Sequence, residues 1–213
     1  MNNSNPALTS EAESTAWPCE RIASKVRDYC VLTKPEVNLL ILMSTSAGYY
    51  LGLHGSFRVA GFVTTLIGTL LVASGTATLN QWMERRWDAQ MRRTSRRPLP
   101  AGRISSGEAL TFGIALSAAG GLLLFVLVNP ISSLLAVSTL LSYLIIYTPL
   151  KRKTPMCTLL GAVPGAMPTL IGWAGSSGSV SWGAMLLFGV LFLWQFPHFL
   201  AIAIMYKEDY ERA

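Results

Sequence analysis

The sequence is poor in charge. Of its 213 residues, 13% are charged and 51% are hydrophobic, whereas a soluble domain carries about 25% charged residues. This balance excludes an ordinary soluble protein and indicates a membrane protein. The first twenty residues contain no lysine or arginine, so they resemble neither a secretory signal nor an arginine-rich transit peptide.

Cysteine is also scarce. Cys19, Cys30 and Cys157 are widely separated and form neither a CxxC pair nor a run with zinc-ligand spacing. The net charge of +6 does not indicate nucleic acid as a partner, because the basic residues lie in short tracts between apolar runs and no base-reading motif accompanies them. The predicted partner is the lipid bilayer.

Six apolar stretches are close to the length that crosses a bilayer. They lie near residues 36–53, 59–83, 108–128, 131–149, 157–175 and 181–206. The predicted fold is therefore all-α, a polytopic transmembrane helical bundle. We expect a polar N-terminal segment over residues 1–34 and a membrane domain over residues 35–213.

Lysine and arginine divide unequally between the connecting segments. Sixteen of the seventeen fall on alternate segments, and all eleven acidic residues lie on the same side. By the positive-inside rule, the N-terminus, the 84–107 loop, the 151–156 loop and the C-terminus are predicted to be cytoplasmic. The simplest location is a bacterial inner membrane, crossed several times.

The second apolar stretch ends in oxygen-bearing side chains. Asn80, Glu84 and Asp88 recur every four residues, so a helix places them on one stripe. Such a stripe at a membrane surface suits Mg²⁺, which takes one or two carboxylates and shares its remaining ligands with water and substrate phosphate. The alternative is a solvated helix end that pairs with Arg85 and Arg86.

The basic loop that follows favours the metal interpretation. It contains Arg92, Arg93, Arg96, Arg97 and Arg103, and guanidinium groups bind phosphate in a bidentate manner. Positive-inside topology explains a basic loop but does not require carboxylates beside it. Acid, metal and arginine together predict a diphosphate site.

The sixth stretch adds a histidine inside the apolar span and a polar tail. An ionisable residue in a span, such as His198, is a functional candidate by default, although a histidine satisfied by a backbone carbonyl is the alternative. Asp209 follows eleven residues later. The predicted topology brings it to the same membrane face as Glu84 and Asp88.

Several stretches, taken in order, resemble the protohaem IX farnesyltransferases, or haem O synthases, a branch of the UbiA-type intramembrane prenyltransferases. They are Thr33-Lys34-Pro35, NQWMERRWDAQMRRTSRRPLPAGRIS from Asn80, YTPLKRKTP from Tyr147, GAVPGAMPTLIGWAG from Gly161 and WQFPHFLAIAIMYKEDYERA from Trp194. Thr169 stands where the family pattern has a second proline. The resemblance implies a helical bundle around a central cavity, with Mg²⁺ as cofactor.

The implied reaction transfers a farnesyl group from farnesyl diphosphate to the 2-vinyl group of protohaem IX (haem B), giving haem O. Haem A synthase or terminal oxidase assembly proteins are the implied partners. The resemblance assigns catalysis to Arg93, Arg97 and His198. It assigns metal binding to Asn80, Glu84, Asp88, Glu208 and Asp209. It assigns substrate binding to Asn80, Arg92, Arg96, Lys151, Tyr206 and Lys207.

The resemblance implies about nine helices, so we expect this chain to be truncated at its C-terminus. Three other functions stay open from sequence. One is a prenyltransferase of the same fold that acts on a quinone precursor or another tetrapyrrole. The second is a transporter or channel, which the one-sided charge disfavours because a transport path requires polar groups across the span. The third is a non-catalytic oxidase assembly factor.

Overall fold

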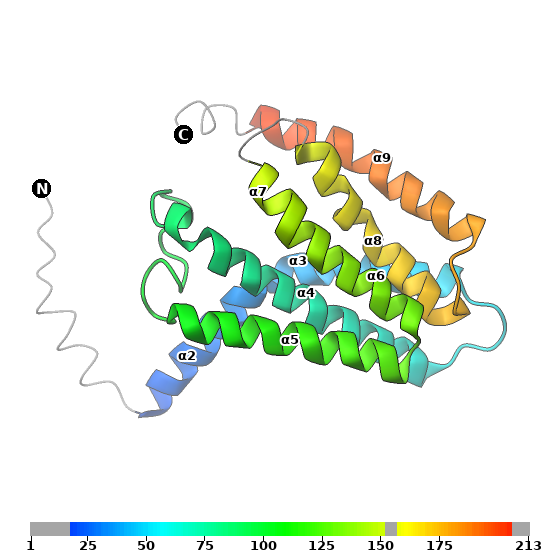
Figure 1. Cartoon of the computed structure of the whole chain (residues 1–213), viewed down its shortest axis with the longest axis horizontal. Helices are drawn as coiled ribbons and strands as arrows, with labels where there is room; N and C mark the ends of the chain where they lie inside the picture. The colour runs from blue at the N-terminus through cyan, green and yellow to red at the C-terminus, as the bar shows by residue number, and fades with distance from the viewer. Residues whose placement is uncertain (1–17, 152–156, 206–213) are drawn as a thin grey trace, which may run out of the picture.

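The computed structural model describes residues 18–151 and 157–205, and within these residues all regular structure is helical. The apolar helices lie side by side in one bundle (Figure 1). Their bounds are α3 (Pro35–Leu51), α4 (Val59–Asp88), α5 (Ser106–Leu127), α6 (Pro130–Leu141), the π-helix η1 (Ser142–Tyr147), α7 (Thr148–Leu150), α8 (Cys157–Ser177) and α9 (Trp182–Met205). The predicted all-α fold is confirmed.

The six predicted spans correspond to these helices, with α6, η1 and α7 forming one continuous span. Three helical stretches are long and apolar enough to cross a membrane, namely α4, α5 and Pro130–Leu150. Many large apolar side chains of the bundle are exposed, as expected where lipid is the surrounding solvent. The protein is a multi-pass membrane protein, and the count of six spans stays a prediction.

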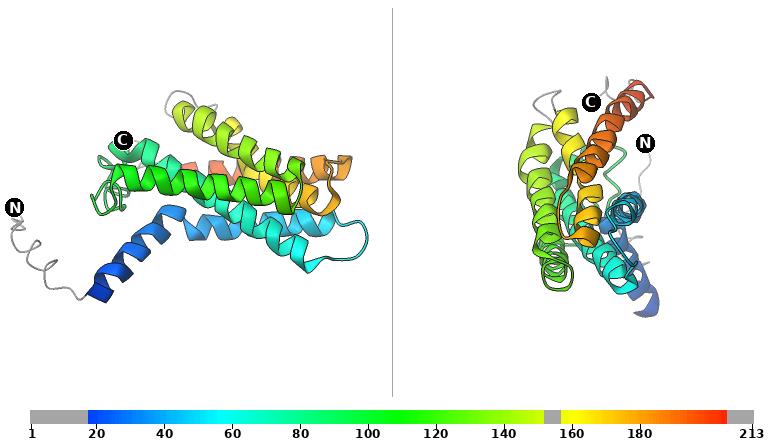
Figure 2. Two further views of the ribbon diagram at one scale, coloured as in Figure 1. Left: turned by 60° about the horizontal axis from the view of Figure 1, so that its bottom comes forward. Right: turned by 90° about the vertical axis from the view of Figure 1, so that its right-hand side faces the viewer.

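One helix was not predicted. α2 (Pro18–Thr33) lies within the segment expected to be merely polar, and it leaves the bundle at an angle to α3 (Figure 2). The residue before a proline is disfavoured in the helical region, and Lys34, which precedes Pro35, adopts a left-handed conformation with φ 52° and ψ 67°. This residue separates α2 from α3.

Small residues allow α3 and α8 to approach closely. A Cβ atom on Gly48 would collide with the backbone of Thr169, and one on Gly172 would collide with the backbone of Thr45. Helix pairs in membranes associate through close backbone packing of this kind. The contact fixes α3 against the centre of the bundle.

Two apolar clusters form the interior. The larger one joins five helical elements and consists of Val72, Leu124, Ala136, Leu140, Leu144 and Ile171. The smaller one lies at the end of the bundle where α4 stops and consists of Leu32, Leu99, Ile104 and Ala109. Because Leu99 and Ile104 belong to residues 89–105, this connection is packed onto the bundle.

Candidate active site

The last three turns of α4 carry the predicted oxygen-bearing stripe. Asn80, Glu84 and Asp88 are 2%, 7% and 6% exposed, so all three lie on the buried side of the helix. A buried carboxylate is costly unless it is paired and hydrogen-bonded. The solvated helix end, the alternative from sequence, is therefore wrong for these carboxylates.

Three basic side chains from three other segments surround the two carboxylates. Lys151 Nζ lies 2.7 Å from a carboxylate oxygen of Glu84, and Arg97 Nη1 lies 2.8 Å from Oδ2 of Asp88. Lys34 is the third. Burial, together with the charges of Arg97 and Lys151, lowers its pKa to about 8, and Glu84 and Asp88 partly offset this effect. We call these five residues the charge cluster.

The connection after α4 positions Arg97. The Thr94 hydroxyl donates to the carbonyl oxygen of Asp88 at 2.9 Å, and the Arg97 amide donates to the carbonyl of Thr94 at 3.0 Å. Leu99 and Ile104 then anchor the chain in the smaller apolar cluster. Arg97 is thus held beside the carboxylate that it contacts.

The π-helix positions the partners of Asn80 and Glu84. Asn80 Nδ2 donates to Oγ1 of Thr148 at 3.1 Å, and this hydroxyl donates to the carbonyl of Tyr143 at 2.9 Å. Proline clashes with the carbonyl four residues before it, and Pro149 directly follows Thr148. A wider π turn relieves this clash, and such turns are frequent at functional sites.

The cluster has a chemistry of its own. Its three cations and two carboxylates leave an excess of one positive charge, which favours an anion. In the part of the chain that the structure describes, no group of three or more His, Cys, Asp or Glu side chains gathers as a metal site. Two carboxylates and the Asn80 amide nevertheless fit Mg²⁺, which completes its shell with water and phosphate oxygens.

The sequence model of the UbiA prenyltransferase family matches residues 41–213. The chain belongs to the UbiA prenyltransferase family. The matched region includes every residue of the charge cluster except Lys34. The family match therefore supports a prenyl-transferring enzyme.

Relatives within the UbiA family are similar over most of this chain. The protoheme IX farnesyltransferase of Solibacter usitatus (strain Ellin6076) is 52% identical over 197 residues, which cover 88% of this chain and 68% of the relative. That of Koribacter versatilis (strain Ellin345) is 41% identical over 209 residues, covering 97% and 67%. The chain thus spans about two thirds of the length of these relatives.

Two solved structures share the UbiA fold. One, from work on digeranylgeranylglyceryl phosphate synthase, gives a TM-score of 0.75 at 18% identity over 89% of this chain and 66% of that chain. The other, a UbiA homologue from Archaeoglobus fulgidus bound to DMAPP and Mg²⁺, gives 0.66 at 19% identity over 84% and 65%. At these identities the likeness establishes the fold.

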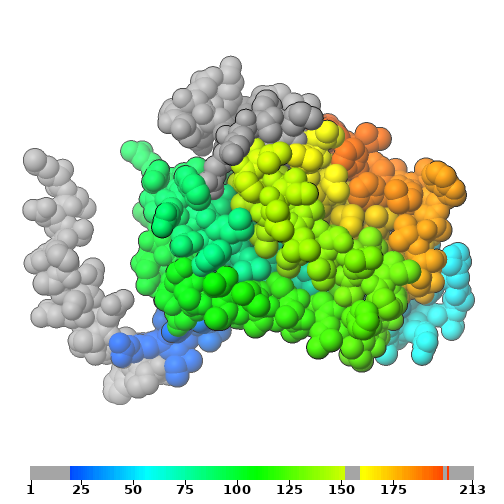
Figure 3. Space-filling model, in the orientation of Figure 1, coloured from blue at the N-terminus to red at the C-terminus, as the bar shows by residue number. Residues whose placement is uncertain are grey.

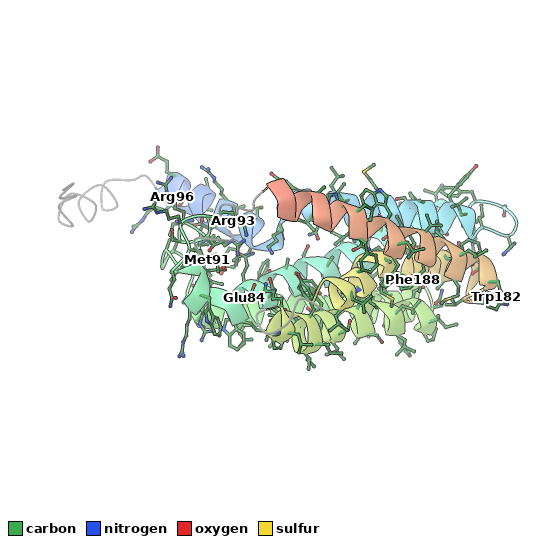
Figure 4. The ribbon with its side chains drawn as sticks, turned by 90° about the horizontal axis from the view of Figure 1, so that it is seen from above. Glu84, Met91, Arg93, Arg96, Trp182 and Phe188 are labelled. Atoms are coloured by element: carbon green, nitrogen blue, oxygen red, sulfur yellow. The ribbon has the colours of Figure 1, made fainter. Side chains whose placement is uncertain are left out.

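The structure distinguishes among the predicted arginines of this UbiA chain. Arg97 contacts Asp88, whereas Arg92, Arg93 and Arg96 are exposed on the connection after α4. Figure 4 shows Arg93 and Arg96 at the same end of the bundle as Glu84, far from Trp182. The pairing of Arg93 with Arg97 at one phosphate stays a prediction.

His198 lies on α9, where it is exposed and its ring stacks on Trp194 with centroids 5.1 Å apart. Its neighbour Gln195 is buried and donates to the carbonyl of Ala162 at 3.1 Å. The contacts described for His198 do not join it to the charge cluster. Four predicted site residues lie outside the described residues, namely Tyr206, Lys207, Glu208 and Asp209.

Two members of the site were missed from sequence. Lys34 and Thr148 both lie in stretches that resemble the family, but neither was predicted as a site residue. The signal for Lys34 was a lysine directly before the proline that opens the first span. For Thr148 it was a Thr-Pro pair at a span end beside a lysine. Lys151, expected to bind substrate, contacts Glu84 directly.

Proposed function

We propose that this chain carries the diphosphate-binding part of a protohaem IX farnesyltransferase. The observation that carries the proposal is the charge cluster, where buried Glu84 and Asp88 are each paired with a cation from a different segment. The relative from Solibacter usitatus, which is 52% identical over 197 residues, bears the protoheme IX farnesyltransferase name. The geometry suits a substrate that brings both negative charge and a metal ion.

In the proposed reaction the bond between C1 of the farnesyl group and its diphosphate oxygen breaks, and the electron pair leaves with the diphosphate. The terminal carbon of the haem 2-vinyl group forms the new bond to C1. The positive charge then rests on the carbon next to the porphyrin ring. Water adds there and loses a proton, giving the hydroxyethylfarnesyl group of haem O.

The chain's own residues act on the diphosphate. Arg97 and Lys151 donate to carboxylates in the structure, and we infer that they turn to phosphate oxygens when substrate binds. Together with Lys34 they stabilise the negative charge that develops on the leaving group. The apolar helices around the site exclude water until the carbon–carbon bond has formed.

We infer that Asn80, Glu84 and Asp88 hold Mg²⁺ together with the diphosphate. When bound, this ion would act as a Lewis acid toward the phosphoryl oxygens. We propose further ligation by Asp209 and Glu208, and diphosphate contacts from Arg93. His198 is proposed to place the haem or to handle a proton.

The proposed setting is a bacterial inner membrane with the charge cluster on the cytoplasmic side. Residues 1–34 then form a cytoplasmic segment, and residues 35–213 belong to the membrane domain. Haem A synthase or terminal oxidase assembly proteins are the proposed partners, because the product serves terminal oxidases. A quinone precursor or another tetrapyrrole is the alternative acceptor.

To test this function, the protein is expressed from its complete native reading frame in cells that lack haem O synthase. The extracted haems are then analysed by mass. We expect haem O with the wild type, a loss of at least about 100-fold with Asp88→Ala, and no loss with Glu36→Ala, an exposed carboxylate on α3. A well-expressed protein that binds a farnesyl diphosphate analogue but yields no haem O would overturn haem as the acceptor.

A further inference from the structure

The helix α2 has an apolar face that the bundle covers only at its Tyr29 and Thr33 end. Ile22, Val26, Tyr29 and Thr33 follow the spacing of one helix face, and Ile22 and Val26 are 66% and 56% exposed. Figure 3 shows α2 projecting beyond the body of the molecule. We call these four residues the lower face of α2.

Contacts with α5 show which way this face points. The rings of Tyr29 and Phe112 meet edge to face at 4.8 Å. Phe112 lies nearly two turns inside α5, a candidate membrane span that begins at Ser106. The lower face of α2 therefore points toward the hydrocarbon region. Ile22 and Val26 extend this face away from the bundle.

A groove opens beneath this face. Its volume is about 370 Å³, and it lies between α3, α4 and α5, with Thr33 at its α2 end. The residues that line it on the lipid side are apolar, among them Leu39, Leu71, Phe112 and Leu116. At its floor, Asn38 donates to Ser74 at 2.8 Å.

Charged side chains of α2, and Glu108 one turn before Phe112 on α5, lie toward the α2 end of the groove. Arg21 and Lys25, four residues apart, border the lower face of α2. Lys25 is paired with Glu108 at 2.7 Å, and Arg103 is paired with Asp28 at 3.0 Å. These pairs fix α2 to the bundle. The connection after α4 adds further arginines at the same end and no acid between residues 89 and 105.

We propose that α2 is an interfacial helix that binds an anionic phospholipid. One acyl chain of this lipid occupies the groove between α3, α4 and α5, and its acidic head group lies beside Arg21 and Lys25. The groove continues the lipid-facing surface of α3 and α5, and basic residues attract anionic lipid at a membrane surface. The inference does not depend on the proposed prenyl transfer.

The first test measures the depth of α2 in the bilayer. Nitroxide labels are placed by Ile22→Cys, or by Ser24→Cys on the opposite side of the helix, in the full chain with its native cysteines changed to serine. The protein is reconstituted in phosphatidylglycerol and phosphatidylcholine nanodiscs. We expect the label at position 22 to be reached by oxygen and the label at position 24 by a water-soluble nickel complex. Equal exposure of both labels to the nickel complex would overturn the interfacial helix.

The second test counts bound lipid by native mass spectrometry after purification in detergent. Leu116→Trp fills the groove, and the matched control Leu122→Trp lies on the same helix but outside the groove. We expect phosphatidylglycerol to remain on wild type and control and to be lost from Leu116→Trp, with about a five-fold lower preference for it in Arg21→Gln. Equal retention in the two tryptophan variants, or retention of phosphatidylcholine as strong as that of phosphatidylglycerol, would overturn the site.

Discussion

Lys34 has a left-handed backbone conformation and a buried ammonium group, and each of these costs free energy. A non-glycine residue in the left-handed region costs roughly 1–2 kcal/mol, and a lysine ammonium loses hydration when it is buried. Both arrangements are found at this residue, which adopts φ 52° and has a pKa lowered to about 8. Strain of this kind gathers at functional sites, and here it places the amine beside Glu84 and Asp88.

The lowered pKa of Lys34 predicts a pH dependence of diphosphate binding. Below pH 8 the amine is protonated and attracts the anion, and above pH 8 it becomes neutral. The Kd for a farnesyl diphosphate analogue with Mg²⁺ should therefore rise up to about ten-fold between pH 7 and pH 9. Titration of the protein in nanodiscs with the analogue at each pH measures this change in Kd.

The control for this prediction is Lys34→Arg, because arginine stays protonated throughout this range. Its Kd should change much less with pH than that of the wild type. If the two proteins show the same pH profile, the titrating group is not Lys34 and the substrate's own phosphates account for the change.

At the scale of the helix, the π turn couples three side chains. Thr148 accepts from Asn80 and donates to Tyr143, and Lys151 reaches Glu84 from the turn that follows. The position of the π turn thus determines how Asn80 and Glu84 on α4 are paired. Pro149, which causes the π turn, can be read from the sequence. The resulting alignment of Thr148 and Lys151 with the stripe on α4 cannot.

Thr148→Val tests this coupling by removing the hydroxyl while keeping the shape of the side chain. Two buried partners lose a hydrogen bond, so we expect a loss of about 1–3 kcal/mol in stability, seen as a lower melting temperature in detergent. Thr139→Val is the matched control, since the hydroxyl of Thr139 donates to Leu135 within its own helix. Equal melting temperatures for the two variants would contradict the coupling.

The close contact of α3 with α8 gives a second prediction at this scale. Gly172→Ala places a Cβ atom against the backbone of Thr45, which cannot move as a flexible side chain would. We expect destabilisation of about 1–3 kcal/mol and separation of the two helices. Gly189→Ala on α9 meets no atom within 4 Å and should be neutral. Thermal unfolding of both variants in the same detergent decides the matter.

Much of the fold was readable from sequence because membrane spans are set by length and apolarity. The ends of α4 and α5 were predicted within a few residues, and the stripe of Asn80, Glu84 and Asp88 followed from helix geometry. The partners of this stripe were harder to predict. Arg97 rather than Arg93 contacts Asp88 because the fold of residues 89–105 depends on packing by Leu99 and Ile104, which no periodicity reveals. α2 was missed because its charged residues masked an amphipathic pattern.

On the scale of the whole molecule, charge is concentrated at one end. The charge cluster, α2 and the connection after α4 share that end, while the turns at the other end carry Arg58 as their one lysine or arginine within the described part of the chain. Moving the basic segments across a bilayer is costly, and basic loops remain on the cytoplasmic side. We therefore expect the charge cluster to face the cytoplasm.

Labelling of single cysteines in spheroplasts tests this orientation. Ser56→Cys and Ser179→Cys lie in the turns at the far end, and both should react with a membrane-impermeant maleimide added outside. Ser95→Cys lies on the connection after α4 and should react only after lysis. The native cysteines are replaced beforehand, so each signal comes from one position. Reaction of Ser95→Cys in intact spheroplasts would reverse the orientation and place the diphosphate site on the outer face, where a substrate made in the cytoplasm could not reach it directly.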